Sequence, residues 1–417
     1  MEVKRDIYLQ RLIERRHNGM AKVVTGLRRC GKSYLLFNIF YNWLLSNGVD
    51  NQYIIRVNLE NFANVGLRDP QKLYEHVTSK ITDDDTHYIL LDEVQMVPHF
   101  EDVLNGFLTL GNTDVYVTGS NAKYLSKDII TEFRGRGDEV SVYPLSFKEY
   151  FSVCTVSEAR AFDQYMQYGG LPQILSLPTE EQKTSYLSNL VVETYLKDIK
   201  ERRKIQKDRE MDDLVDILAS SIGSLTNPTT IANTFVTQYK SEIDADTIKS
   251  YIEHLSDAFL LERCKRFDVK GRRYIDTPYK YYFTDLGLRN ARLGFSQIDQ
   301  GHMMENVIYN ELRIRGFNVD VGTVPVRKKN AEGKLVRSQL EVDFIAHIGN
   351  RRYYIQSAHE MRDEEKMAQE MASLSNIDDD FKKIIVVADD ISVKRNERGI
   401  VVMSIYDFLL RDNALEL

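Results

Sequence analysis

Two glycines, a lysine and a serine near the start of the chain have the spacing of a known phosphate-binding pattern. The stretch VVTGLRRCGKSYLL (23–36) fits the pattern G-x-x-x-x-G-K-[ST] at every fixed position. Glycines let the backbone aim successive N–H groups inward, and the start of a helix adds partial positive charge, so this pattern predicts a phosphate-binding loop. Its expected members are Gly26, Leu27, Arg28, Arg29, Cys30, Gly31, Lys32, Ser33 and Tyr34.

Within this loop, two side chains have distinct expected roles. Lys32 can reach the β- and γ-phosphates of a nucleotide, and the Ser33 hydroxyl can take a coordination position on Mg²⁺. These residues therefore predict the phosphates of a nucleotide and Mg²⁺ as the ligands.

A pair of acids ends the apolar run YILLDE (88–93). Ligands of open α/β sheets bind at the carboxyl ends of the strands, so Asp92 and Glu93 are expected beside the phosphate loop. Asp92 is assigned to hold Mg²⁺ through water. Glu93 is assigned to orient or deprotonate the attacking water.

Two weaker elements follow the acids. After VYVTGS (115–120), Ser120 or Asn121 could polarise the water or sense the γ-phosphate, and a helix N-cap is almost as good an interpretation of Asn121. Arg134 and Arg136 precede the run VSVYPL (140–145). Either arginine could reach the γ-phosphate of a neighbouring subunit, which would need a homo-oligomer, or both could be surface cations.

The elements that must position these residues form an α/β pattern. Short apolar runs alternate with stretches that favour helices, which predicts a parallel sheet covered on both faces. The runs are KVVTG (22–26), YIIRVNL (53–59), YILLDE (88–93), VYVTGS (115–120) and VSVYPL (140–145).

The rest of the chain divides by pattern. Helical segments fill residues 151–210, three short helices and a hairpin with the outline of a winged helix fill 211–295, and a mixed α/β unit fills 296–417. With the α/β core assigned to residues 1–150, the sequence predicts four domains.

Composition limits the classes of function. The 417 residues carry a net charge of -7, which argues against a protein whose whole surface grips nucleic acid. No apolar run approaches the roughly 20 residues of a membrane helix, and the charged N-terminus lacks the apolar block of a signal peptide. Three widely spaced cysteines, Cys30, Cys154 and Cys264, indicate the reducing cytoplasm.

The four nucleotide-site elements, in this order, resemble those of AAA+ ATPases. Over residues 20–360 the chain is similar to a prokaryotic group of AAA-type ATPases, through the stretches GLRRCGKS, TGSNAKYLS, RGR…VYPLSFKEY, YGGLPQIL, KYYFTDLGLRN, EVDFIA and YYIQSA. The resemblance implies ATP binding and hydrolysis, a helical lid, a winged helix and a nuclease-like C-terminal fold. It departs from the family in the lid, where Lys197 is a weak candidate for the second sensor cation.

Two cationic runs lie in the C-terminal half. Residues 263–273 (RCKRFDVKGRR) suit contact with a phosphate backbone, with the helix TIKSYIEHL entering a groove, but Asp246 and Glu253 near that helix favour protein docking instead. Residues 326–337 (VRKKNAEGKLVR) are a solvated hairpin tip in the first interpretation and a nucleic-acid contact in the second. DNA and a protein partner both remain open.

The last segment resembles the PD-(D/E)xK nuclease fold, with Glu305 on a helix and Asp343 on a strand. A second acid and a lysine would be needed to hold Mg²⁺ and activate water, and Gln356 and Ala358 stand in their places. We therefore predict that this domain has no nuclease activity. The leading hypothesis is an ATP-driven switch or motor, and the alternative is a DNA-binding regulator for which the nucleotide is mainly a ligand.

Overall fold

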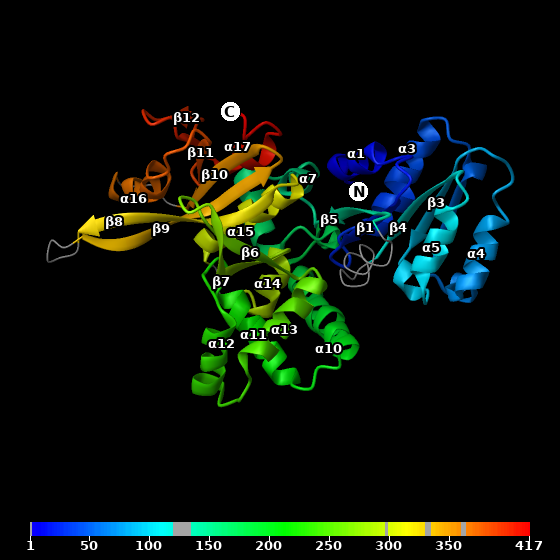
Figure 1. The fold of residues 1–417 in the computed structure, drawn as a ribbon, viewed down its shortest axis with the longest axis horizontal. Coiled ribbons are helices and arrows are strands. Elements are labelled where there is room, and N and C mark those ends of the chain that lie inside the picture. The colour runs from blue at the N-terminus through cyan, green and yellow to red at the C-terminus, as the bar shows by residue number, and fades with distance from the viewer. Residues whose placement is uncertain (1, 120–134, 297–298, 330–334, 360–363) are drawn as a thin grey trace. The chain divides into compact units, whose positions relative to one another are not determined.

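The computed structural model describes residues 2–119, 135–296, 299–329, 335–359 and 364–417 (Figure 1). The chain divides into two compact units. The first comprises residues 1–144 with 256–259, and the second comprises residues 145–255 with 260–417. In the described ranges no helix has the length and apolar character needed to cross a membrane.

The first unit contains a five-stranded sheet in which every pairing is parallel, in the order β2-β3-β4-β1-β5. The strands are β1 (Ala21–Gly26), β2 (Ile54–Asn58), β3 (His87–Asp92), β4 (Thr113–Thr118) and β5 (Gly137–Val142). All residues of β1 and β3 are buried, as expected for strands covered on both faces. The prediction of an α/β fold around a parallel sheet is confirmed.

Helices surround this sheet. They are α1 (Asp6–Glu14), α2 (Lys32–Tyr34), η1 (Leu35–Phe40), α3 (Tyr41–Ser46), η2 (Asn51–Tyr53), η3 (Phe62–Arg68), α4 (Pro70–Thr78), η4 (Val94–Met96) and α5 (Phe100–Leu108). α2, η1 and α3 follow one another without a break and form one helix, which begins at the last residues of the phosphate loop.

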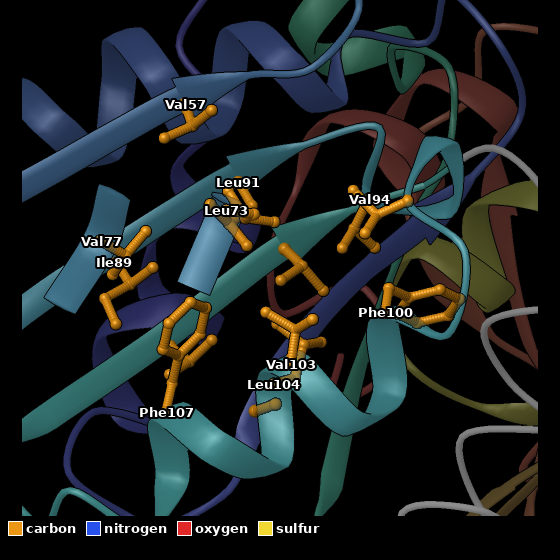
Figure 2. Packing of buried hydrophobic residues seen from close by; sticks show 14 of the residues in the cluster. Val57, Leu73, Val77, Ile89, Leu91, Val94, Phe100, Val103, Leu104 and Phe107 are labelled. Atoms are coloured by element: carbon orange, nitrogen blue, oxygen red, sulfur yellow. The ribbon is translucent and has the colours of Figure 1, made fainter. Parts of the chain in front are cut away.

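The core of this unit lies between one face of the sheet and helices α4 and α5 (Figure 2). Leu73 and Val77 of α4 and Leu104 and Phe107 of α5 pack with strand residues such as Leu91, all fully buried. Burying such side chains stabilises the fold by about 1.5–3 kcal/mol each, so the core fixes where the ends of β1, β3 and β4 lie.

The second unit begins with helices. They are α7 (Phe147–Phe151), α8 (Glu158–Tyr168), η6 (Pro172–Ser176), α9 (Glu180–Asn189), η7 (Leu190–Leu196), α10 (Lys197–Arg203), α11 (Asp208–Ser220), α12 (Pro228–Thr234), η8 (Phe235–Tyr239) and α13 (Ala245–Asp257). The order of three helices followed by a hairpin that the sequence predicts is present from α11 onward, and its assignment as a winged helix stays a prediction.

A second, mixed sheet of eight strands completes this unit, in the order β12-β13-β11-β10-β9-β8-β6-β7. The strands are β6 (Leu261–Asp268), β7 (Arg273–Phe283), β8 (Asn318–Lys329), β9 (Leu335–Ile348), β10 (Arg351–Ala358), β11 (Lys382–Val387), β12 (Lys394–Arg395) and β13 (Val401–Ser404). Its helices are α14 (Leu286–Arg292), α15 (Gln300–Ile314), α16 (Glu364–Ser375) and α17 (Ile405–Leu410). The β6–β7 hairpin does not stand alone, because β6 pairs with β8.

The stretches YGGLP and TDLGLRN, far apart in the sequence, meet in the second unit. Asp285 is buried at the start of α14 and accepts hydrogen bonds from the N–H groups of Gly170 (2.8 Å) and Leu288 (3.1 Å). Burial raises the pKa of Asp285 to about 6, against the lowering effect of those N–H groups. A Cβ on Gly287 would lie 2.1 Å from the Tyr168 carbonyl oxygen, so only glycine lets α14 approach α8 this closely.

Candidate nucleotide-binding site

The loop between β1 and α2 has a backbone that its glycines make possible. Gly26 and Gly31 have φ of 137° and 102°, and Arg29 between them has φ of 64°. A Cβ on Gly26 would lie 2.0 Å from the Val142 carbonyl oxygen, so the loop could not pack against the end of β5 with any other residue there. Glycine is therefore needed at the first fixed position both for its backbone conformation and for this close approach to β5.

Lys32 lies over this loop. Its Nζ donates to the carbonyl oxygens of Gly26 (2.9 Å) and Leu27 (3.0 Å), and the side chain is buried. An ammonium carries three hydrogens, so these two contacts orient the charge and leave one hydrogen for a phosphate oxygen. The lysine is held in place by the loop that it serves.

Ser33 and Asp92 meet across the gap between the loop and β3. The Ser33 hydroxyl donates to Asp92 Oδ1 over 2.7 Å, and the Thr118 hydroxyl donates to the same oxygen over 2.6 Å. Burial raises the pKa of Asp92, and the two hydroxyls act in the opposite direction. A hydroxyl and a carboxylate are the hard oxygen ligands that Mg²⁺ prefers, so the residues present fit that ion.

Glu93 follows directly and leaves the strand. Its φ is 55°, in the left-handed region, and its N–H donates to the Thr118 hydroxyl oxygen over 2.9 Å. Its half-buried carboxylate accepts a hydrogen bond from the Gln95 amide. Asp92 and Glu93 are therefore both fixed through one threonine at the end of β4.

Thr118 is a site residue that the motif analysis missed. The sequence pointed further along the same segment, to Ser120 and Asn121, which lie outside the described residues. Parallel pairing of Leu91 with Val117 brings the next residue of each strand together. A hydroxyl on the last residue of an apolar run, one strand from the acids, is the signal that could have found it.

A second group missed from the sequence holds the outside of the loop. Arg5 is buried and donates to the carbonyl oxygens of Cys30 (3.1 Å) and Tyr143 (2.7 Å). The Tyr143 N–H in turn donates to the Tyr8 hydroxyl over 3.1 Å. Because these contacts join α1, the loop and the end of β5, residues before the phosphate motif help to shape it.

The remaining predicted loop residues differ in their exposure to solvent. Arg28 is 3.7 Å from Glu60, and Tyr34 is 43% exposed. Cys30 is buried, and its thiol contacts the Val142 carbonyl oxygen over 3.3 Å, so it packs in the core.

Of the two predicted arginines, the structure describes Arg136, which is not brought to the loop. Arg134 lies outside the described residues. Arg136 is exposed, and its carbonyl oxygen accepts from the N–H of Ala21 over 2.9 Å, at the start of β1. The phosphate loop follows the other end of β1, so Arg136 does not join the site of its own chain.

The second sheet contains a separate, buried group of charges. Lys280 Nζ lies 2.8 Å from Glu305 Oε1, 2.7 Å from Glu341 Oε1 and 3.6 Å from Asp343 Oδ1. Burial lowers the pKa of Lys280, but the three carboxylates outweigh it and the net shift is upward. Burial and the neighbouring Glu305 raise the pKa of Asp343 to about 8.

Gln356 and Ala358 lie on β10, beside this group. The side-chain Oε1 of Gln356 accepts from the Asp343 N–H over 3.4 Å, and its Nε2 donates to Glu370 Oε2 over 3.0 Å. Sequence reasoning singled out Glu305 and Asp343 but missed Lys280, whose ammonium lies among the acids.

The chain matches known families along much of its length. Residues 18–151 match the family described as AAA domain, and residues 159–299 match a domain of unknown function (DUF8612). An uncharacterised protein of Haemophilus influenzae is 32% identical over 98% of this chain and 99% of its own. This chain belongs to the same family as the Haemophilus influenzae protein, and the N-terminal unit of this chain is an AAA domain.

Two more distant similarities were also found. The uncharacterised protein MJ1544 of Methanocaldococcus jannaschii is 29% identical over 83% of this chain and 76% of its own length. The solved structure of the Aeropyrum pernix ORC1 protein in complex with DNA covers 70% of this chain and 93% of its own, at 14% identity and a TM-score of 0.30. A score this low carries no argument, and the membership rests on the sequence matches.

Proposed function

We propose that the AAA domain hydrolyses ATP to ADP and phosphate, and that the second unit couples this cycle to a macromolecular partner. The observation that supports it most directly is the 2.7 Å contact between Ser33 and Asp92, beside a lysine already oriented over the loop. An ammonium and a hydroxyl from the start of α2 therefore lie near a carboxylate from the end of β3.

Each residue has a defined part in this proposal. The loop N–H groups and the remaining Lys32 hydrogen bind the β- and γ-phosphates. Ser33 and Asp92 would hold Mg²⁺, which neutralises charge on the phosphate oxygens. Glu93 orients a water molecule in line with the γ-phosphate and accepts its proton as the bond to the leaving ADP breaks.

The exposed Arg136 fits a role between chains. At the far end of β1 it could contact only the nucleotide of a neighbouring copy, so a homo-oligomer would be the active form. We keep the cytoplasm as the proposed location and the four-domain division as the proposed organisation, with the last two domains sharing one sheet.

The substitution Glu93→Gln tests the proposal. It keeps the side chain's size and removes the proton acceptor, so we expect ATP binding by calorimetry to persist while phosphate release falls about 10²-fold or more. The matched control is Glu75→Gln on α4, an exposed glutamate outside the site, which should leave turnover unchanged. Full turnover in the Glu93 variant would remove the assigned base.

A further inference from the structure

Strand pairing in the second sheet joins the two cationic runs of the sequence. β6 pairs in parallel with β8, so that Asp268 lies opposite Thr323, and the Val269 N–H donates to the Thr323 carbonyl oxygen over 3.0 Å. The turn between β6 and β7 therefore lies along the base of the β8–β9 hairpin, which extends beyond the rest of the sheet (Figure 1). Runs that are remote in sequence become neighbours.

Alternation along the strands places four arginines on one face. Arg327 lies opposite Arg337, and Arg337 is two residues from Gln339, so all three share a face. Arg266 reaches the same face, since its Nη2 donates to Gln339 Oε1 over 3.3 Å. Asp268 is two residues further along β6, and Arg273 lies opposite it. We call Arg266, Arg273, Arg327 and Arg337, with Lys270 and Arg272 of the turn, the hairpin surface.

We propose that the hairpin surface binds the sugar–phosphate backbone of duplex DNA. This inference rests on the part of the proposed function that gives the second unit a partner, and it names that partner. The exposed guanidinium groups of Arg327 and Arg337 lie directly opposite each other across β8 and β9. Like charges in this position destabilise a strand pair, and an array of phosphates would relieve the repulsion.

Few acids compete for these cations. Among the described residues, neither Arg327 nor Arg337 forms an ion pair with an acid. Lys270 with Asp378 and Arg273 with Asp268 are exposed or partly exposed pairs at 4.0 Å, which phosphates could displace at little cost. The chain as a whole has more acidic than basic residues, 62 against 55, so the excess of cations on the hairpin surface is opposite in sign to the charge of the whole chain.

Geometry favours the hairpins over helix α13 as the DNA-contacting element. A two-stranded ribbon fits the major groove of a duplex, which is about 12 Å wide. The exposed charges on α13 are Asp246, Lys249 and Glu253, which sum to a negative face. The acids that made the sequence ambiguous belong to α13, whereas the hairpin surface carries the cations that suit the phosphates of duplex DNA.

The test measures binding of a short labelled DNA duplex by fluorescence anisotropy at graded salt, without nucleotide. We expect Arg327→Glu/Arg337→Glu to weaken binding about tenfold or more, and to lower the slope of log affinity against log salt by about 2. Both arginines are exposed, so the fold should persist, and an unchanged melting temperature checks this. Arg327→Lys/Arg337→Lys keeps the charge and should retain most of the affinity.

Helix α13 supplies the matched control. Lys249→Glu reverses one exposed charge there and should leave binding unchanged. The proposal is overturned if the wild type does not bind duplex DNA at low salt, or if Lys249→Glu weakens binding as much as the double variant does. It is also overturned if polyglutamate displaces the labelled duplex as well as unlabelled duplex does. Because no nucleotide is present, a failure of ATP hydrolysis would leave this result intact, and Glu93→Gln should bind DNA like the wild type.

Discussion

Each unit of the chain contains a buried lysine surrounded by oxygen atoms, and the two lysines differ in whether those oxygen atoms carry a charge. Lys32 donates to two uncharged loop carbonyls, so its positive charge is oriented but not neutralised. Lys280 lies among three carboxylates, so its charge is more than neutralised. The first arrangement can bind an anion, whereas the second is already satisfied by the protein itself.

This difference teaches how a buried cation signals function. Burial alone does not separate the two, because Lys32 and Lys280 are 4% and 3% exposed. The chemistry of the partners does: neutral carbonyl acceptors leave a charge available, while carboxylates use it up. The Lys280 group is then better explained as part of the fold than as a site.

The largest expected effect comes from Lys280→Met. The substitution keeps an unbranched side chain of similar length but leaves two buried carboxylates and the partly exposed Glu341 without their cation, so we expect a loss of about 3–5 kcal/mol in the free energy of unfolding. Denaturant unfolding measures it. ATP turnover of the protein that remains folded should not change.

Two other lysines make this test a comparison. Lys32→Met should do the reverse, abolishing ATP binding with a small effect on unfolding, and the exposed Lys270→Met should change stability little. Equal loss of ATP binding in the Lys280 and Lys32 variants would mean that the two buried lysines do not differ as described.

A second expectation concerns pH. Three carboxylates around one ammonium cannot all be ionised at low cost, and the pKa of Asp343 is accordingly raised to about 8. The folded protein therefore holds a proton that the unfolded chain, with an aspartate pKa of about 3.9, releases. Stability from this group is complete below about pH 4 and is lost as the pH rises towards about 8.

The measurement is the free energy of unfolding across that range, in the wild type and in Asp343→Asn. The amide cannot ionise, so the variant should lose this part of the decline. An identical pH dependence in both proteins would show that Asp343 does not carry the proton.

The smallest effect is expected for Thr118→Val in the nucleotide site. Valine has nearly the same shape but removes the hydroxyl that contacts Asp92 and Glu93, so turnover should fall about tenfold, in line with about 1–1.5 kcal/mol for a hydrogen bond. Steady-state kinetics with ATP measures it. The effect should appear in kcat more than in nucleotide affinity, and unchanged kcat would remove Thr118 from the site.

The sequence predicted that the loop and the acid at the end of β3 would lie together, as Ser33 and Asp92 do, because these signals are local. The loop pattern and the apolar runs that end at Asp92 each occupy a few consecutive residues, and their positions at strand ends follow from a parallel sheet. Thr118, Arg5 and Lys280 were missed because their partners come from other strands or helices. Only the register of the folded sheet brings a hydroxyl to Asp92 or an ammonium to Asp343.

The same limit explains why the C-terminal half stayed open. The runs 263–273 and 326–337 look like independent loops in the sequence, and their common surface depends on the pairing of β6 with β8. Likewise, a boundary near residue 295 follows the local pattern, but the sheet continues across it.

That continuity has a practical consequence for anyone dissecting the chain. A cut after residue 295 would remove β8, the partner of β6, and expose a row of unpaired backbone N–H and C=O groups. Such an exposed strand edge promotes self-association. We therefore expect fragments divided at this position to aggregate, and their properties will not represent those of the intact chain.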